Sequence, residues 1–174
     1  MRPGKRKATA APPRFGASGR ALKRTALSWC MLSCLAFGGI GPAAGQTVVD
    51  ADTIKVGDQT FRLYGIDVPD ARQSCDDGAW FPRAHAVAAL TQFIGDRKVE
   101  CIQVYTDLKA GLPVGLCNAG GSDLQAFMVG QGWDWVVRPD GLKYIDYERQ
   151  ATSLRRGVHG HECERADRWR RKQQ

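Results

Sequence analysis

The stretch from residue 48 to residue 70 reads VVDADTIKVGDQTFRLYGIDVPD and decides the fold. Apolar and polar residues alternate on both sides of a turn at residues 57–58, and this period of two is typical of β-strands. We therefore predict a β-hairpin over residues 47–66 whose apolar side chains fill a core. The ends of this hairpin present a cluster of charged side chains, namely Asp50, Asp52, Arg62, Asp67 and Asp70.

This charged cluster indicates a cation site beside a phosphate site. Carboxylates at such density need a cation, and hard oxygen ligands such as Asp52 and Asp67 suit Ca²⁺ or Mg²⁺. The guanidinium of Arg62 offers a bidentate grip on phosphate. Metal, arginine and carboxylate together are the elements of phosphodiester chemistry.

The chain resembles the staphylococcal-nuclease-like, or thermonuclease, family. The resemblance rests on Val-x-Asp-x-Asp-Thr-Ile at residues 48–54, followed by Phe-Arg-Leu-x-Gly-Ile-Asp-x-Pro-Asp at residues 61–70. Further matches run to Trp169-Arg170-Arg171, so the resemblance covers residues 47–171. It implies an α+β protein, mainly β, built on a five-stranded OB-fold barrel with about three helices. It also implies Ca²⁺-dependent hydrolysis of DNA or RNA.

The resemblance implies a role for each member of the charged cluster. Asp52, Asp67 and the main-chain carbonyl of Val68 would hold one Ca²⁺, with Asp50 nearby as an accessory acid. Arg62 would bind the scissile phosphate. Nucleic acid is then the expected substrate or ligand, and we expect a monomer.

Three departures from the family pattern predict a weakened site. Asp70 stands where the family has a water-activating glutamate, and its shorter side chain reduces its reach. Ala51 replaces a glycine, which would strain a turn that needs positive φ. Gly111 replaces a second phosphate-binding arginine, a group that can contribute roughly 10³ to 10⁵ in rate. Lys109 lies two residues away and offers a point charge without the guanidinium fork.

Two further functional hypotheses follow from these departures. The first is a catalytically inactive OB-fold module that still binds metal, nucleic acid or a protein partner. The second is a structural or partner-binding envelope protein, which we rank last because it does not account for the acidic cluster.

The first 45 residues differ in composition from the rest and are predicted to be an export signal. They hold eight basic residues and no acidic one, then an apolar run over residues 26–40 and a small-x-small cleavage site at residues 43–45. The apolar run is short for a bilayer span, so a retained anchor is the lesser alternative. Without these residues, 17 basic residues face 18 acidic ones, and the basic charge of the whole chain no longer argues for nucleic-acid affinity.

The mature protein, residues 46–174, is therefore expected in the periplasm or secreted, without stable membrane insertion. It retains an even number of cysteines, which in an exported chain favours two disulfides. A hairpin that turns near residue 109 would place Cys101 opposite Cys117, leaving Cys75 to pair with Cys163. Free buried thiols are the alternative.

The remaining pattern predicts one compact domain with helices between and after the strands. Strands are expected over residues 98–105 and 113–118. Helices are expected over residues 79–94, from a Ser122 cap to about residue 129, and from about 143 to 156. Beyond these, we expect the basic tail over residues 165–172 to be a solvated or frayed C-terminus, with contact to phosphates as the lesser alternative.

Overall fold

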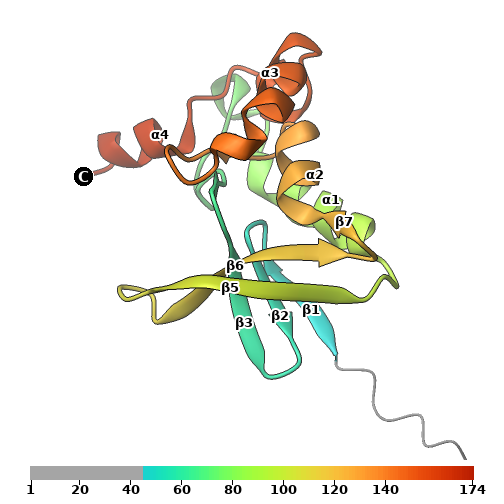
Figure 1. Ribbon diagram of the computed structural model, residues 1–174. Helices are drawn as coiled ribbons and strands as arrows, with labels where there is room; N and C mark the ends of the chain where they lie inside the picture. Colours follow the sequence, from blue (N-terminus) through green and yellow to red (C-terminus); the bar gives the residue numbers. More distant parts are fainter. Residues whose placement is uncertain (1–44) are drawn as a thin grey trace, which may run out of the picture. The chain divides into compact units, whose positions relative to one another are not determined.

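The computed structural model describes residues 45–174, which form one α+β unit (Figure 1). Its strands are β1 (Gln46–Asp50), β2 (Thr53–Val56), β3 (Gln59–Leu63), β4 (Ile66–Asp67), β5 (Val99–Asp107), β6 (Leu112–Ala119), β7 (Ser122–Asp123) and β8 (Trp135–Val136). Its α-helices are α1 (Pro82–Ile94), α2 (Leu124–Gly130), α3 (Ile145–Ser153) and α4 (Ala166–Lys172). Short 3₁₀ turns are η1 (Asp76–Gly78), η2 (Leu142–Tyr144) and η3 (Gly157–Gly160). The predicted signal peptide, apart from Gly45, lies outside the described residues.

The main sheet is mixed and curls into a half-barrel. Its strands run in the order β1-β2-β3-β6-β5, with β7 added on β6, and β3 pairs with β6 in parallel. The predicted α+β class is confirmed, but a closed five-stranded barrel is not what this strand order shows. The edge strands β1 and β5 are joined instead by the side chain of Gln46, whose amide donates to the carbonyl of Arg97 at 2.5 Å and accepts from the main-chain N–H of Val99 at 2.8 Å.

The predicted first hairpin is a three-stranded meander, because the chain turns twice. One turn lies at Gly57, which has a φ of +59°. Glycine adopts this conformation without steric cost because it has no Cβ atom. The other follows a bulge between Val48 and Asp50 and contains Ala51. The described non-glycine residues with positive φ lie elsewhere, at 76, 77 and 155, so Ala51 does not carry the strain that the sequence suggested.

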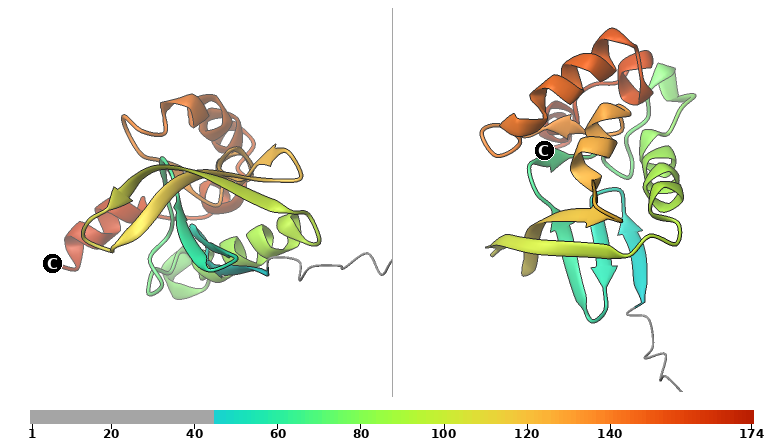
Figure 2. Two further views of the ribbon diagram at one scale, coloured as in Figure 1. Left: turned by 60° about the horizontal axis from the view of Figure 1, so that its bottom comes forward. Right: turned by 45° about the vertical axis from the view of Figure 1, so that its right-hand side comes forward.

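The helices gather at one end of the curled sheet, as Figures 1 and 2 show. Helix α1 begins at Pro82 and presents Ala86, Leu90 and Ile94 to the core at helical spacing. These side chains pack with residues of the meander such as Ile54 in one apolar cluster. The core thus joins sheet and helices and fixes the loops that connect them.

Three helix predictions need correction. Asp123, not Ser122, caps α2, because its carboxylate accepts from the N–H of Ala126 at 3.0 Å. The helix predicted over residues 143–156 is split into η2 and α3. The basic tail is not frayed: residues 166–172 form α4, whose buried Ala166 packs in a small cluster with Trp135 and Val158.

Both predicted disulfides are confirmed. Cys101 and Cys117 face each other across β5 and β6 with a Cα–Cα separation of 4.1 Å. Cys75 and Cys163 are joined with a separation of 4.8 Å, which ties the segment before α4 to the loop after β4. Within residues 45–174 no helix is both long and apolar enough to cross a membrane.

Candidate functional site

The first pair of the candidate site is made by Asp52 and Arg62. Asp52 lies in the turn before β2 and is buried, and its carbonyl accepts from the N–H of Leu63 at 2.7 Å. Thr53 and Arg62 face each other in the β2–β3 register. Asp52 therefore accepts from Thr53 Oγ1 at 2.8 Å through one oxygen and from Arg62 Nε at 2.9 Å through the other.

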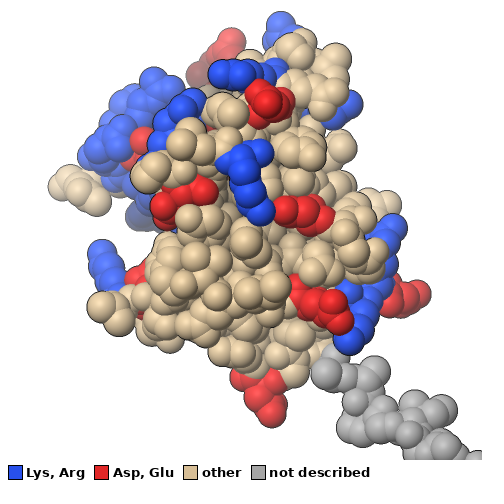
Figure 3. Space-filling view, in the orientation of Figure 1, with Lys and Arg blue, Asp and Glu red and all other residues tan. Residues whose placement is uncertain are grey.

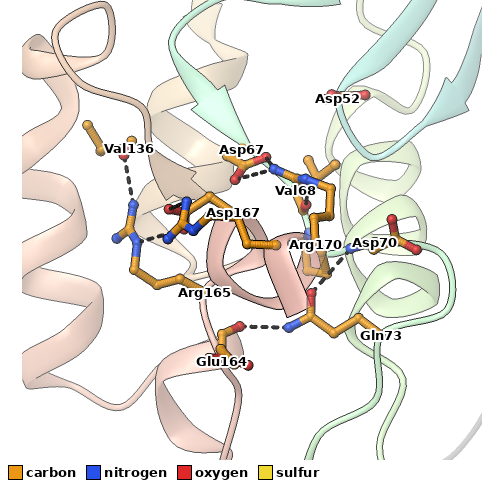
Figure 4. A network of polar contacts seen from close by, with 12 residues as sticks. Asp52, Asp67, Val68, Asp70, Gln73, Val136, Glu164, Arg165, Asp167 and Arg170 are labelled. Carbon is orange, nitrogen blue, oxygen red and sulfur yellow. Dashed lines mark hydrogen bonds and ion pairs between the residues drawn. The ribbon is translucent and has the colours of Figure 1, made fainter. Parts of the chain in front are cut away.

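The second pair is made by Asp67 and Arg170, which lie far apart in the sequence. Asp67 ends β4 and is only 7% exposed. Arg170 reaches in from α4, and its Nη2 lies 2.6 and 2.8 Å from the two carboxylate oxygens of Asp67 (Figure 4). Its Nη1 lies 3.5 Å from the carbonyl oxygen of Val68. Burial raises the pKa of Asp67 although Arg170 opposes this shift.

A third carboxylate, Asp107, completes this side of the site. It lies at the end of β5 and 3.5 Å from Arg62 Nη1. Hydrogen bonds from the main-chain N–H groups of Ala110 and Lys109 lower the pKa of Asp107 and also shape the hairpin tip. A cavity of about 180 Å³ opens here, lined among others by Arg62, Asp67, Asp107 and Tyr105.

Asp50, predicted as an accessory acid, is held by Arg83 of α1. Arg83 Nε donates to Asp50 at 2.7 Å and Nη2 contacts the other oxygen, while Nη1 donates to the carbonyl of Pro69 at 2.5 Å. The guanidinium of Arg83 on α1 thus balances the negative charge of Asp50. Its contacts fix the loop that follows β4 rather than extending the predicted cation site.

Asp70, the predicted water-activating residue, caps its own loop. Its carboxylate accepts from the N–H of Arg72 at 3.0 Å. Its own N–H donates to the side chain of Gln73 at 3.3 Å, and that side chain in turn donates to the carbonyl of Glu164 at 2.6 Å. In Figure 4 the Asp70 carboxylate points away from the pair formed by Asp67 and Arg170. The structure does not bring Asp70 together with the other predicted groups.

Lys109 and Gly111 lie at the tip of the β5–β6 hairpin and are exposed. Gly111 has a φ of +68°, and its N–H donates to the carbonyl of Asp107 at 2.7 Å. A glycine in this conformation after a short turn is the usual way to close such a hairpin. The position that lacks the expected arginine is therefore one where the local backbone favours glycine.

The oxygens of the predicted Ca²⁺ site face a cation in this structure, the guanidinium of Arg170. One guanidinium contacts both groups, through Nη2 to the Asp67 carboxylate and through Nη1 to the Val68 carbonyl oxygen. Buried carboxylate and carbonyl oxygens are the chemistry that Ca²⁺ prefers. Within residues 45–174 no group of three or more His, Cys, Asp or Glu side chains is placed to hold a metal ion. Asp52 is directed to Arg62 instead, and in Figure 4 it lies apart from Asp67.

Sequence reasoning missed Asp134, which lies immediately before β8. It is fully buried, and neither carboxylate oxygen has a hydrogen-bond partner among the described residues. Burial, together with the nearby charges of Asp52 and Asp67, raises the pKa of Asp134 well above its ordinary value. An acid between two tryptophans in an apolar run was the available signal. No signal in the sequence indicated the role of Arg83, because an arginine on a helix is usually solvated.

No model of a known protein family matches the chain, and no curated protein matches it. The resemblance to the thermonuclease family therefore remains a prediction from the quoted motifs.

Proposed function

We propose that this protein is a Ca²⁺-dependent phosphodiesterase that hydrolyses DNA or RNA slowly, as a monomer with an OB-type barrel. One observation supports the proposal most directly. The Asp67 carboxylate and the Val68 carbonyl both contact the guanidinium of Arg170, and the buried Asp52 is paired with Arg62. Such a pattern of alternating acids and guanidinium groups suits a cation and a phosphate side by side.

Each residue of the site has its own role in the proposed reaction. Asp67, the Val68 carbonyl and Asp52 would hold Ca²⁺, which when bound supplies positive charge for the phosphate oxygens. Arg62 is 40% exposed at its side chain and lines the cavity, so its Nη groups can donate to a phosphodiester. Asp107 shares Arg62 and orients the guanidinium towards the cavity.

We expect slow hydrolysis because of the position of Asp70, the residue that would activate water. Asp70 caps its own loop, and general-base catalysis needs a carboxylate within hydrogen-bond distance of the water. Turnover would require this cap to open. The site therefore combines intact binding groups with a poorly placed base.

Export to the periplasm or to the medium is part of the proposal. The two disulfides suit an oxidising compartment, and the predicted signal at residues 1–45 provides a route. The described residues also carry a local basic patch despite the balanced charge of residues 46–174. Figure 3 shows it over α4, to which Arg168, Arg171 and Lys172 contribute. This patch adjoins Arg170 and offers contacts to a nucleic-acid backbone.

The second candidate function is a catalytically inactive module that binds nucleic acid. The engagement of Asp70 in its own loop favours this alternative, because it leaves the binding groups intact without a positioned base. Calcium and phosphate would then bind without turnover.

Cleavage of single-stranded DNA by the purified protein, in Ca²⁺ and in chelator, tests the proposal. We expect slow cleavage that chelator abolishes. Asp67→Asn and Arg62→Ala should each reduce it by at least about 100-fold, since each removes a charge that faces the phosphate or the cation. Arg149→Ala, a change on the exposed face of α3, serves as the matched control and should leave cleavage unchanged.

Calcium binding by the same variants separates the two candidates. If Ca²⁺ binds through Asp67 but no cleavage is detected, the inactive module is correct. If Asp67→Asn leaves calcium affinity unchanged, the assigned cation site is wrong.

A further inference from the structure

The guanidinium of Arg170 lies where a metal ion between Asp67 and Val68 would lie. Its Nη2 is 2.6 and 2.8 Å from the two carboxylate oxygens of Asp67, and its Nη1 is 3.5 Å from the carbonyl oxygen of Val68. Ca²⁺ binds such oxygens at about 2.3–2.6 Å. An ion that bridges these two groups would therefore overlap with the guanidinium. The ion and Arg170 cannot hold both groups at the same time.

The position of α4 does not depend on Arg170. The disulfide to Cys163 holds the segment before the helix. Arg165, directly before the helix, donates to Glu148 at 3.1 Å. Ala166 is fully buried in a small apolar cluster. These anchors all lie at or before the first turn, so α4 can keep its place while the side chain of Arg170 moves.

The side chain of Arg170 also has room to leave the site. It is 39% exposed, whereas the side chain of Asp67 is 10% exposed. Figure 4 shows it reaching from α4 to Asp67. Rotation about its side-chain bonds moves the guanidinium into solvent without any change in the backbone.

Asp67 needs a cationic partner when no metal is bound. A buried carboxylate without a partner is unfavourable. Asp134 shows that case, because it is fully buried and has no hydrogen-bond partner among the described residues. Arg62, the other guanidinium of the site, is directed to Asp52. Arg170 is therefore the group that balances the charge of Asp67 in this structure.

We propose that Arg170 is a placeholder cation, which occupies the Asp67 site in the absence of Ca²⁺ and leaves it when Ca²⁺ binds. The inference rests on the proposed function, because it concerns the calcium site of the same reaction. Without metal, the guanidinium keeps the buried carboxylate paired and the site preformed. Because the two cations exclude each other, Arg170 lowers the calcium affinity of the site and sets the concentration at which it fills.

Chemical modification of the wild type by phenylglyoxal, a reagent for guanidinium groups, tests the displacement directly. Saturating calcium should raise the modification rate of Arg170 several-fold, as measured by peptide mass spectrometry, because its guanidinium moves from Asp67 into solvent. Arg171 is the internal control: it is exposed, pairs with Asp167 on its own helix and should react at an unchanged rate. An unchanged rate for Arg170 would overturn the proposal.

Calcium affinity measured by calorimetry gives a second readout. Arg170→Gln should bind Ca²⁺ at least about fivefold more tightly than the wild type, because the competing cation is gone. Arg170→Lys should be intermediate, since it keeps the charge and loses the fork. Arg171→Gln removes the same charge from the neighbouring position and should change the affinity by less than about twofold. Equal affinities of Arg170→Gln and the wild type would contradict the competition.

Melting temperatures separate a placeholder from a purely structural ion pair. In chelator, Arg170→Gln should melt below the wild type, because Asp67 has lost its partner. Calcium should then raise the melting temperature of the variant by more than that of the wild type, which follows from its tighter binding. A purely structural pair predicts equal calcium-induced shifts in the two proteins, and that result would overturn the proposal.

The failure of this proposal and the failure of the proposed function give different results. If calcium displaces Arg170 but DNA is never cleaved, the phosphodiesterase proposal fails and the placeholder role stands. If the wild type cleaves DNA with calcium and Arg170→Gln has the calcium affinity of the wild type, only the placeholder role fails. If neither protein binds Ca²⁺, both are overturned.

Discussion

At the scale of single residues, burial decides how the acids of the site behave. Asp67 and Asp134 have the same side chain and lie in neighbouring parts of the fold, but only Asp67 has a guanidinium partner. The pKa of each is raised by burial, and that of Asp134 most strongly because nearby acids add to the effect. Burial therefore favours the neutral form of Asp134.

This neutral acid makes stability depend on pH with a definite sign. Because the pKa of Asp134 is higher in the folded than in the unfolded protein, the folded state binds more protons between the two values. Its contribution is complete below the unfolded pKa, about 4, and is lost as the pH rises through the folded value. The substitution Asp134→Asn removes this pH-dependent loss of stability, because asparagine does not titrate. We expect the variant to be more stable than the wild type at pH 8 by on the order of 1 kcal/mol or more.

Urea unfolding between pH 5 and pH 8 measures the difference. The stability gap between Asp134→Asn and the wild type should open as the pH rises. His159, whose pKa is lowered by burial, titrates identically in both proteins and cancels in the comparison. Asp146→Asn, at an exposed site on α3, should give no gap. A gap that is constant across this pH range would contradict the assignment of a neutral Asp134.

At the scale of elements, helix caps and turns position the site more than the helix and strand propensities of the residues do. Asp123 caps α2 and also accepts from the buried hydroxyl of Tyr144 at 3.0 Å, so one side chain ties α2 to η2. Gly111 closes the β5–β6 hairpin with a positive φ. In both cases the local hydrogen bonds explain the residue without reference to catalysis.

The two candidate caps of α2 can be separated by mutation. Asp123→Ala removes the cap, worth about 1 kcal/mol, and leaves the Tyr144 hydroxyl unsatisfied at a further cost of about 1–3 kcal/mol. Ser122→Ala changes an exposed residue and should cost less than about 0.5 kcal/mol. Thermal or urea unfolding checks both. Equal losses for the two variants would show that the cap assignment is wrong.

At the scale of the whole molecule, the chain returns to its first strands to complete the site. The C-terminal helix reaches β4 because a disulfide with a sequence separation of 88 closes this long loop, whereas the other disulfide closes one of 16. Entropic cross-linking is stronger for longer loops. The Cys75–Cys163 disulfide should therefore be the larger contributor to stability.

Paired alanine variants compare the two disulfides. Loop entropy predicts losses of about 4.5 kcal/mol for Cys75→Ala with Cys163→Ala, and about 3 kcal/mol for Cys101→Ala with Cys117→Ala. Unfolding in urea under non-reducing conditions measures both. The reverse order of stability losses would contradict the loop-entropy argument.

The sequence by itself determined the strands around residues 48–70, the first helix and both disulfide pairings. These follow from short-range rules: a period of two, helical spacing and a hairpin that places Cys101 opposite Cys117. It also placed Asp52 beside Arg62, because the two residues lie on adjoining strands.

The tertiary structure alone decided which cation faces Asp67, which acid is buried without a partner, and that the basic tail is a helix. Arg170 and Arg83 act through contacts made over long sequence separations, which no local pattern encodes. The open half-barrel was equally hidden, because alternation fixes the face of each strand but not the pairing at the edges of the sheet. Local periodicity therefore specifies elements, whereas burial and long-range pairing specify the charge and the partners of each site residue.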